Sequence, residues 1–184
     1  MRFDFVNKKI GVFGIQQSGK THFARELLKC FRAPFVYRLT GDFDNVENAI
    51  IFKQTDKYGD LDLFLATAKR LGTAGKIDAV VLDEFDLFAT ESRLSQGLLN
   101  EMILMHAHFN LSIVLLSRRP QDIPSKVFES CHIIVNFIID GPAAKRKFID
   151  LHADYETLMP HLQFEKHNYI LKELGRPPLL FEAL

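Results

Sequence analysis

Eight residues near the N-terminus have the types and spacing of a phosphate-binding loop. The segment Gly14-Ile15-Gln16-Gln17-Ser18-Gly19-Lys20-Thr21 matches the pattern G-x-x-x-x-G-K-[ST], with an apolar run at 10–13 before it and a helix-forming run at 22–31 after it. Glycines at both ends of the loop allow a tight curve in which successive backbone N–H groups point at phosphate oxygens. The N-terminus of the following helix attracts the same anion. The motif therefore predicts a nucleoside triphosphate site.

The residues of this loop have separate expected roles. Lys20 is expected to reach the β- and γ-phosphates and to act in catalysis, and the Thr21 hydroxyl is expected to ligate Mg²⁺. The other positions predicted to bind the nucleotide are Gly14, Gln17, Ser18, Gly19 and His22. The predicted ligands are ATP and Mg²⁺.

An acidic pair follows a second apolar run. Residues 79–82 are continuously apolar, as expected of a strand covered on both faces of a parallel sheet, and Asp83 and Glu84 come directly after them. Acidic residues at the carboxyl end of such a strand lie at the crevice where open α/β sheets bind ligands. Asp83 is expected to hold Mg²⁺, and Glu84 is expected to polarise an attacking water. The glutamate indicates hydrolysis rather than transfer to a small acceptor.

The elements that must position these residues alternate between strands and helices. Strand-like segments cover 35–39, 49–52, 112–116 and 132–139, and helical segments cover 61–71 and 95–109. Buried apolar strands in this alternation predict an α/β fold, a three-layer P-loop NTPase sandwich with a mainly parallel sheet. A strand between the two motif strands is typical of ATPases with an added catalytic glutamate, the RecA-like (ASCE) class. We expect one domain over 1–184, with 141–184 as a candidate accessory helical or oligomer-contact segment.

Composition narrows the functional classes. The chain has 184 residues, 47% apolar and 25% charged, as in ordinary globular proteins, and 17 phenylalanines indicate an aromatic-rich core. No run approaches the roughly 18–20 apolar residues of a membrane span, and the N-terminus does not resemble a secretory signal, so a cytoplasmic location without a transmembrane segment is expected. The 23 basic and 23 acidic residues cancel. A DNA contact would therefore need a local patch or an assembled ring.

The strand at 112–116 ends in Ser117-Arg118-Arg119-Pro120. Together with the segment Val80-Val81-Leu82-Asp83-Glu84-Phe85, this ending resembles the HerA–FtsK superfamily of ATP-driven DNA pumps, and the resemblance extends over about residues 8–140. In that superfamily the strand after the acid pair characteristically ends in Thr-Gln-Arg-Pro, and the glutamine senses the γ-phosphate. Arg118 occupies the position of that glutamine here. The resemblance therefore assigns phosphate sensing to Arg118 or to Ser117.

The resemblance implies an ATPase that translocates double-stranded DNA through a ring of identical subunits, as in a hexamer. In such rings a neighbouring subunit supplies an arginine to the phosphates. Arg93 is the predicted arginine, and Arg118 and Arg119 are alternatives. Superfamily members with membrane segments, DNA-reading domains or a β-barrel need more than 184 residues, so the expected use is packaging of a viral genome. The site of action would be the host cytoplasm or the virion, with capsid or inner-membrane proteins as partners.

Two alternative functions stay open. One is a P-loop kinase for a small molecule, although the acid pair and the intervening strand argue against it. The other is a nucleotide-dependent regulatory or assembly module that moves no DNA, which the zero net charge and the arginine at position 118 leave open.

Overall fold

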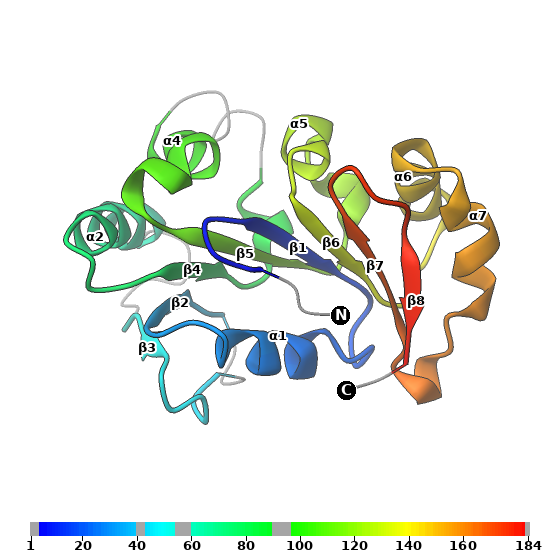
Figure 1. The fold of residues 1–184 in the computed structure, drawn as a ribbon, viewed down its shortest axis with the longest axis horizontal. Helices are drawn as coiled ribbons and strands as arrows, with labels where there is room; N and C mark the ends of the chain where they lie inside the picture. The colour runs from blue at the N-terminus through cyan, green and yellow to red at the C-terminus, as the bar shows by residue number, and fades with distance from the viewer. Residues whose placement is uncertain (1–3, 40–42, 54–59, 90–96, 183–184) are drawn as a thin grey trace.

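The computed structural model describes residues 4–39, 43–53, 60–89 and 97–182. The strands are β1 (Lys9–Phe13), β2 (Pro34–Tyr37), β3 (Ile50–Ile51), β4 (Ala79–Leu82), β5 (Ser112–Ser117), β6 (Ile133–Asn136), β7 (Tyr169–Glu173) and β8 (Leu179–Phe181). They form one sheet in the order β3-β2-β4-β5-β1-β6-β7-β8, parallel from β3 to β6 and antiparallel from there on (Figure 1). The predicted mainly parallel α/β sandwich is confirmed.

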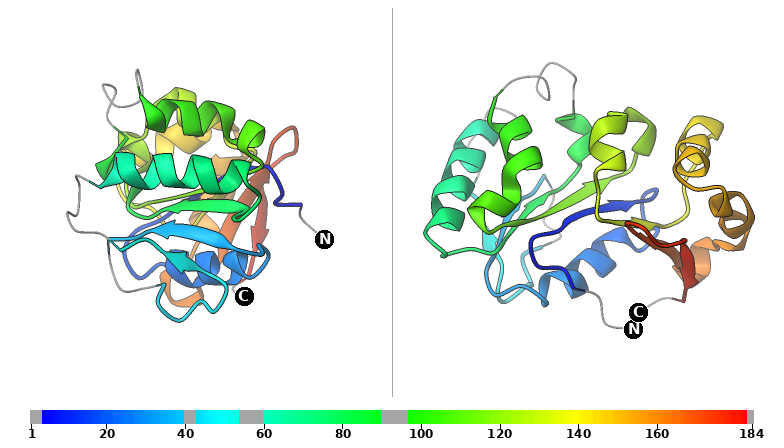
Figure 2. Two further views of the ribbon diagram at one scale, coloured as in Figure 1. Left: turned by 90° about the vertical axis from the view of Figure 1, so that its left-hand side faces the viewer. Right: turned by 45° about the horizontal axis from the view of Figure 1, so that its top comes forward.

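Helices cover both faces of the sheet. One face is covered by α1 (Lys20–Leu28), and the opposite face by α2 (Leu61–Thr73), α4 (Leu98–Met105), α5 (Ser125–Glu129) and α6 (Pro142–Leu151), with α7 (Asp154–Leu158) beside α6 (Figures 1 and 2). Short 3₁₀ turns cover Phe85–Leu87, His106–Phe109, Pro120–Asp122, Met159–His161 and Phe164–Lys166. Among the described residues, no helix combines the length and the apolar character that crossing a bilayer requires.

Alternation along the strands divides the core into two apolar layers. Ile10 and Val12 of β1 face the α1 side, whereas Phe13 faces the opposite layer. There the Phe13 ring lies 5.1 Å from the Phe128 ring and 5.8 Å from the Phe148 ring, measured between centroids. Burying each side chain of this size stabilises the fold by about 1.5–3 kcal/mol. The central strand is therefore held firmly from both faces.

Several segments differ from the sequence-based expectation, and β6 covers only Ile133–Asn136 of the strand expected at 132–139. β3 has two residues rather than four, because it lies at the sheet edge with a single partner strand. Of the helix expected at 95–109, residues 95 and 96 lie outside the described part, Leu98–Met105 are α-helical, and His106–Phe109 form a 3₁₀ turn. Asn110 ends this turn in the left-handed conformation (φ 55°). The C-terminal segment is not wholly helical, because β7 and β8 form an antiparallel hairpin that extends the sheet.

Two histidines are packed at the amino end of the central strands. The Lys9 backbone N–H donates to Nδ1 of His132 at 3.0 Å, and Nδ1 of His106 donates to the Leu111 carbonyl at 2.7 Å. The two imidazole rings meet edge to face, with centroids 5.9 Å apart. Burial lowers the pKa of both histidines, and the charge of the neighbouring Lys9 lowers it further. Both rings are therefore neutral in the folded protein at neutral pH.

Acidification is expected to destabilise the fold through these two histidines. Their pKa is lower in the folded protein than in the unfolded chain, whose histidines titrate near 6.5, so the unfolded chain takes up protons that the folded protein does not. The stability present at pH 7.5 therefore falls as the pH is lowered through 6.5 toward the pKa of the folded state. Urea unfolding at pH 7.5 and pH 5.5 measures this loss, which is about 1.4 kcal/mol for each tenfold difference in proton affinity.

His106→Gln supplies the matching variant, because an amide can still donate to the Leu111 carbonyl but does not titrate. The loss of stability between the two pH values is expected to be smaller in this variant than in the wild type. The exposed neighbour His108 provides the control, since His108→Gln is expected to leave the profile unchanged. A His106→Gln profile as steep as that of the wild type would contradict the assignment.

Candidate active site

The phosphate-binding loop runs from the end of β1 into α1. Its path is fixed from both sides, since the Gly14 N–H donates to the Ser117 carbonyl at 3.3 Å and the Ile15 N–H donates to the Ile138 carbonyl at 3.0 Å. A Cβ atom at Gly14 would lie 2.6 Å from the Ser18 Oγ, and Gly19 has φ 105°. Both positions therefore require glycine, one for space and one for conformation.

The loop carries polar groups that fit a polyphosphate. The Ser18 Oγ is buried and has no hydrogen-bond partner within the described part of the chain. The Lys20 Nζ donates to the Ile15 carbonyl at 3.2 Å, across the mouth of the loop. Burial lowers the pKa of Lys20, and the nearby Glu84 carboxylate opposes that shift. A buried unpaired hydroxyl and a partly desolvated ammonium beside a helix N-terminus fit phosphate oxygens.

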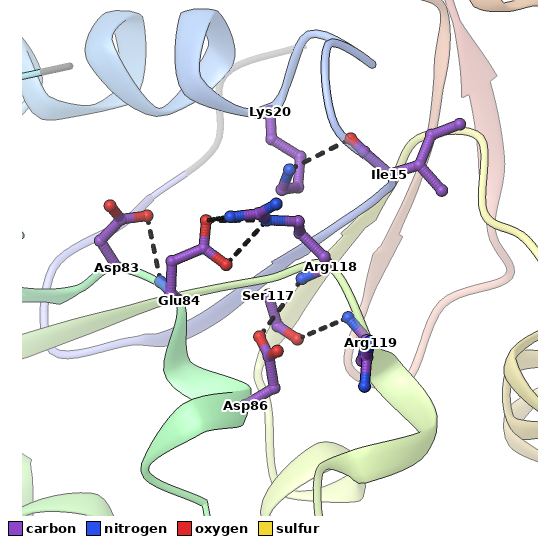
Figure 3. Close-up of polar contacts among 8 residues, drawn as sticks. All are labelled: Ile15, Lys20, Asp83, Glu84, Asp86, Ser117, Arg118 and Arg119. Atoms are coloured by element: carbon purple, nitrogen blue, oxygen red, sulfur yellow. Dashed lines mark hydrogen bonds and ion pairs between the residues drawn. The ribbon is translucent and has the colours of Figure 1, made fainter. Parts of the chain in front are cut away.

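The acidic pair emerges beside the end of β5. Leu82, the last residue of β4, is paired with Leu115, so Asp83 and Glu84 come level with the last residues of that strand. Asp83 is 8% exposed, and its Oδ1 accepts the Glu84 N–H at 3.0 Å. Glu84 has φ 52° and ψ 46°, a left-handed conformation that costs an ordinary residue about 1–2 kcal/mol. This turn directs the Glu84 side chain toward Lys20 and Arg118 (Figure 3).

Arg118 binds both carboxylate oxygens of Glu84. The Arg118 Nε lies 2.8 Å from Oε1 and 2.9 Å from Oε2, and Nη2 lies 2.5 Å from Oε1 (Figure 3). The Arg118 backbone N–H is directed at Asp86 Oδ1 at 3.4 Å. The Glu84 side chain is 15% exposed and that of Arg118 is 42% exposed. Hydrogen bonding to Glu84 raises the pKa of Arg118, so the guanidinium keeps its charge in this contact.

The other residues predicted for the site lie in different environments. The buried Ser117 Oγ accepts the Arg119 N–H at 3.0 Å and so shapes the turn after β5. The Arg119 side chain is 69% exposed and lies 3.7 Å from Asp122. Gln17 and His22 are exposed on the rim of the loop, whereas Thr21 is half-buried at the start of α1. Arg93 lies outside the described residues.

Sequence reasoning missed two features of the site. One is the ion pair between Arg118 and Glu84, which are 34 residues apart and meet only because β4 and β5 are neighbours. The other is an aromatic group on the far side of the loop, made by Phe137, His167 and Tyr169. The sequence signal for the first was the arginine in place of the expected glutamine. The second had no local signal.

Solved structures with the same fold cover almost the whole chain. The genome-packaging NTPase B204 of Sulfolobus turreted icosahedral virus 2, solved with sulfate, superimposes with a TM-score of 0.79 at 12% identity, covering 99% of this chain and 98% of that chain. The DNA-packaging ATPase B204 of Sulfolobus turreted icosahedral virus superimposes with a TM-score of 0.74 at 13% identity, covering 98% and 100%. No family model and no curated protein matches the sequence.

A third similar structure is that of a secretion ATPase. The cytoplasmic domain of the type VII secretion ATPase EccC of Thermomonospora curvata superimposes with a TM-score of 0.67 at 14% identity, over 96% of this chain and 25% of that chain. The resemblance read from the acid pair and the Ser-Arg-Arg-Pro ending is thus confirmed at the level of the fold. This chain has the P-loop ATPase fold shared by these viral genome-packaging and type VII secretion ATPases.

Proposed function

We propose that this chain hydrolyses ATP and uses the energy to translocate double-stranded DNA, as the packaging ATPase of a viral genome. The observation that carries the proposal is the convergence of Lys20, Glu84 and Arg118 at the carboxyl ends of β1, β4 and β5. A phosphate-binding lysine, a carboxylate and a guanidinium in one crevice supply the three groups that phosphoryl transfer to water requires.

In the proposed reaction each residue of the site has its own role. The loop N–H groups, Ser18 and Lys20 bind the phosphates of the substrate. Thr21 and Asp83 would hold Mg²⁺, which supplies charge neutralisation for the phosphates when it is bound. Glu84 orients a water and accepts its proton as the water oxygen attacks the γ-phosphorus. The bond between that phosphorus and the oxygen bridging to the β-phosphate breaks, leaving ADP and inorganic phosphate.

The ion pair gives Arg118 a role before and during this reaction. A carboxylate whose two oxygens both accept hydrogen bonds from a guanidinium is poorly placed to take a proton from water, because those oxygens are already occupied. The γ-phosphate is a competing anion for the same guanidinium. In the proposed cycle Arg118 moves from Glu84 to the phosphate, which frees the base and places positive charge where negative charge develops.

Translocation of DNA is the more specific part of the proposal, beyond hydrolysis of ATP. It is supported by the similarity to B204, which is described as a genome-packaging NTPase and was solved with ATP-γ-S. Of the basic run in α6, Lys145 and Arg146 are exposed and available to DNA, whereas Lys147 donates to the Ile123 carbonyl and lies 5.3 Å from the centroid of the Phe128 ring. A ring of identical subunits, expected to be a hexamer, would concentrate such exposed charge.

The remaining partners are also proposals. Within the ring, Arg93 or Arg119 would complete the site of the adjacent subunit. Capsid or inner-membrane proteins would dock the ring, in the host cytoplasm or the virion.

A nucleotide-gated assembly module is the second candidate. The Arg118–Glu84 pair is the observation that favours it, because a pair that persisted after nucleotide binding would keep hydrolysis slow. A kinase is disfavoured by the presence of Glu84 after Asp83, since a second carboxylate that activates water is proposed for hydrolysis and is not needed for transfer to a small acceptor.

Hydrolysis is expected to be stimulated by DNA and to depend on Glu84. Steady-state release of phosphate from ATP with Mg²⁺ is measured with and without long double-stranded DNA. Glu84→Gln is expected to lower kcat by about 10²–10⁴-fold, since the amide cannot accept the proton. The control is Glu101→Gln, which removes a carboxylate that pairs with Lys69 at 2.6 Å on the helical layer. Hydrolysis indifferent to DNA would favour the assembly module.

Arg118 is expected to be needed for turnover even though it binds Glu84, the proposed general base. Arg118→Gln, which restores the glutamine of the resembled superfamily, and Arg118→Ala are compared with the wild type. We expect kcat to fall by at least about 10²-fold in Arg118→Ala, with a smaller loss in Arg118→Gln, because a positioned donor stabilises the transition state. Faster hydrolysis in Arg118→Ala would show that the arginine only restrains Glu84.

A further inference from the structure

A pocket of about 480 Å³ opens beside the phosphate-binding loop, on the side away from the acidic pair. One wall consists of residue 17 and residues 19–23, from the loop and the start of α1. The other wall consists of three rings, those of Phe137, His167 and Tyr169. The mechanism above uses none of these rings.

The order of the strands places this pocket and the proposed catalytic groups on opposite sides of β1. On one side of β1 lie β5 and β4, which carry Arg118 and Glu84. On the other side lie β6 and β7, which carry Phe137 and Tyr169 at their ends (Figure 1). A triphosphate in the loop, with its γ-phosphate toward Glu84, therefore has its nucleoside end toward the rings.

The pocket has a rigid apolar floor. Phe137 and Tyr169 are 2% and 6% exposed, and their ring centroids are 5.4 Å apart. The Phe23 ring of α1 packs edge-on against both, at 6.0 Å from Phe137 and 5.1 Å from Tyr169. The three buried side chains of the lining are thus all aromatic. A flat apolar ligand group could rest on this floor in van der Waals contact with it.

His167 is exposed at the edge of the pocket, and we call its turn the lip. A Cβ atom at Gly19 would lie 3.2 Å from the His167 Cβ, so the lip packs so closely on the phosphate-binding loop that a larger residue at position 19 would be crowded. His167 is in the left-handed conformation, with φ 48°. The buried Asn168 fixes this turn, because its Oδ1 accepts the Gln163 N–H at 2.7 Å and its Nδ2 donates to the His161 carbonyl at 2.9 Å. An exposed ring on a clamped turn is suited to stacking.

We propose that this pocket binds the base of the nucleoside triphosphate, stacked by His167 against the floor of Phe137 and Tyr169. The inference rests on the proposed ATPase function and adds to it how the substrate is recognised. Aromatic stacking tolerates any base, because every base presents a π-face. The site therefore recognises the class of nucleoside triphosphates by shape and stacking, and the phosphate loop supplies the rest of the affinity.

Binding of two probes separates the base pocket from the phosphate site. Calorimetry with Mg²⁺ measures Kd for ATP-γ-S, which carries a base, and for inorganic tripolyphosphate, which does not. His167→Ala is expected to weaken ATP-γ-S by about tenfold, with a similar loss for GTP-γ-S, and to leave tripolyphosphate unchanged. His167→Tyr is expected to restore ATP-γ-S binding. His161→Ala, an exposed histidine of the same segment outside the lining, is the control.

Several other outcomes would contradict the base pocket, and one of them would also contradict the proposed ATPase function. If ATP-γ-S binds His167→Ala as it binds the wild type, or if tripolyphosphate is weakened equally, the base does not lie in this pocket. A loss confined to one of the two nucleotides would reject stacking as the mode of recognition. A wild-type protein that binds tripolyphosphate and ATP-γ-S equally well would overturn the base pocket alone. A wild-type protein that binds neither probe would overturn the proposed ATPase function together with the pocket.

Discussion

The site depends on the parallel pairing of β1 between β5 and β6. Phe13 at the end of β1 is level with Ser117 on one side and Asn136 on the other, so three strands end together. The backbone groups of a buried central strand must find partners, because an unpaired N–H or C=O in the core is costly. The pairing continues past the strand, where Gly14 and Ile15 donate to the carbonyls of Ser117 and Ile138. Strand order and register together thus bring the loop at 14–21 beside the ionic groups that follow β4 and β5 and the aromatic groups of β6 and β7.

The two sides of β1 have opposite chemical character. Toward β4 and β5 the crevice is ionic, with the Glu84–Arg118 pair near the Lys20 ammonium. Toward β6 and β7 it is apolar and aromatic. A nucleoside triphosphate has the same division, a charged polyphosphate at one end and a flat base at the other. The polarity of the crevice therefore matches the polarity of the proposed substrate along its length.

Backbone strain is concentrated around this crevice. Five non-glycine residues with positive φ occur among the described residues, and the two that lie away from the site are Asn7 and Asn110, a residue type that tolerates the left-handed region. The other three are Gln17 in the loop, Glu84 after β4 and His167 at the lip. Such conformations persist only where the surrounding packing fixes them, and they occur preferentially at functional sites. Here the aromatic core on both faces of the sheet provides that packing.

Local pattern was sufficient to predict the α/β class, and it singled out the loop at 14–21 and the acidic pair as candidate site residues. Both candidates are encoded in a few consecutive residues. The spacing of glycine and lysine marks Gly14 to Thr21, and the apolar run before them marks Asp83 and Glu84. The hairpin of β7 and β8 escaped prediction because its partner, β6, lies more than thirty residues earlier in the chain. Only the tertiary structure decided that Arg118 pairs with Glu84 and that His167 covers Gly19. Both contacts depend on which strands become neighbours, and strand order is set by packing of the whole sheet rather than by any local run of residues.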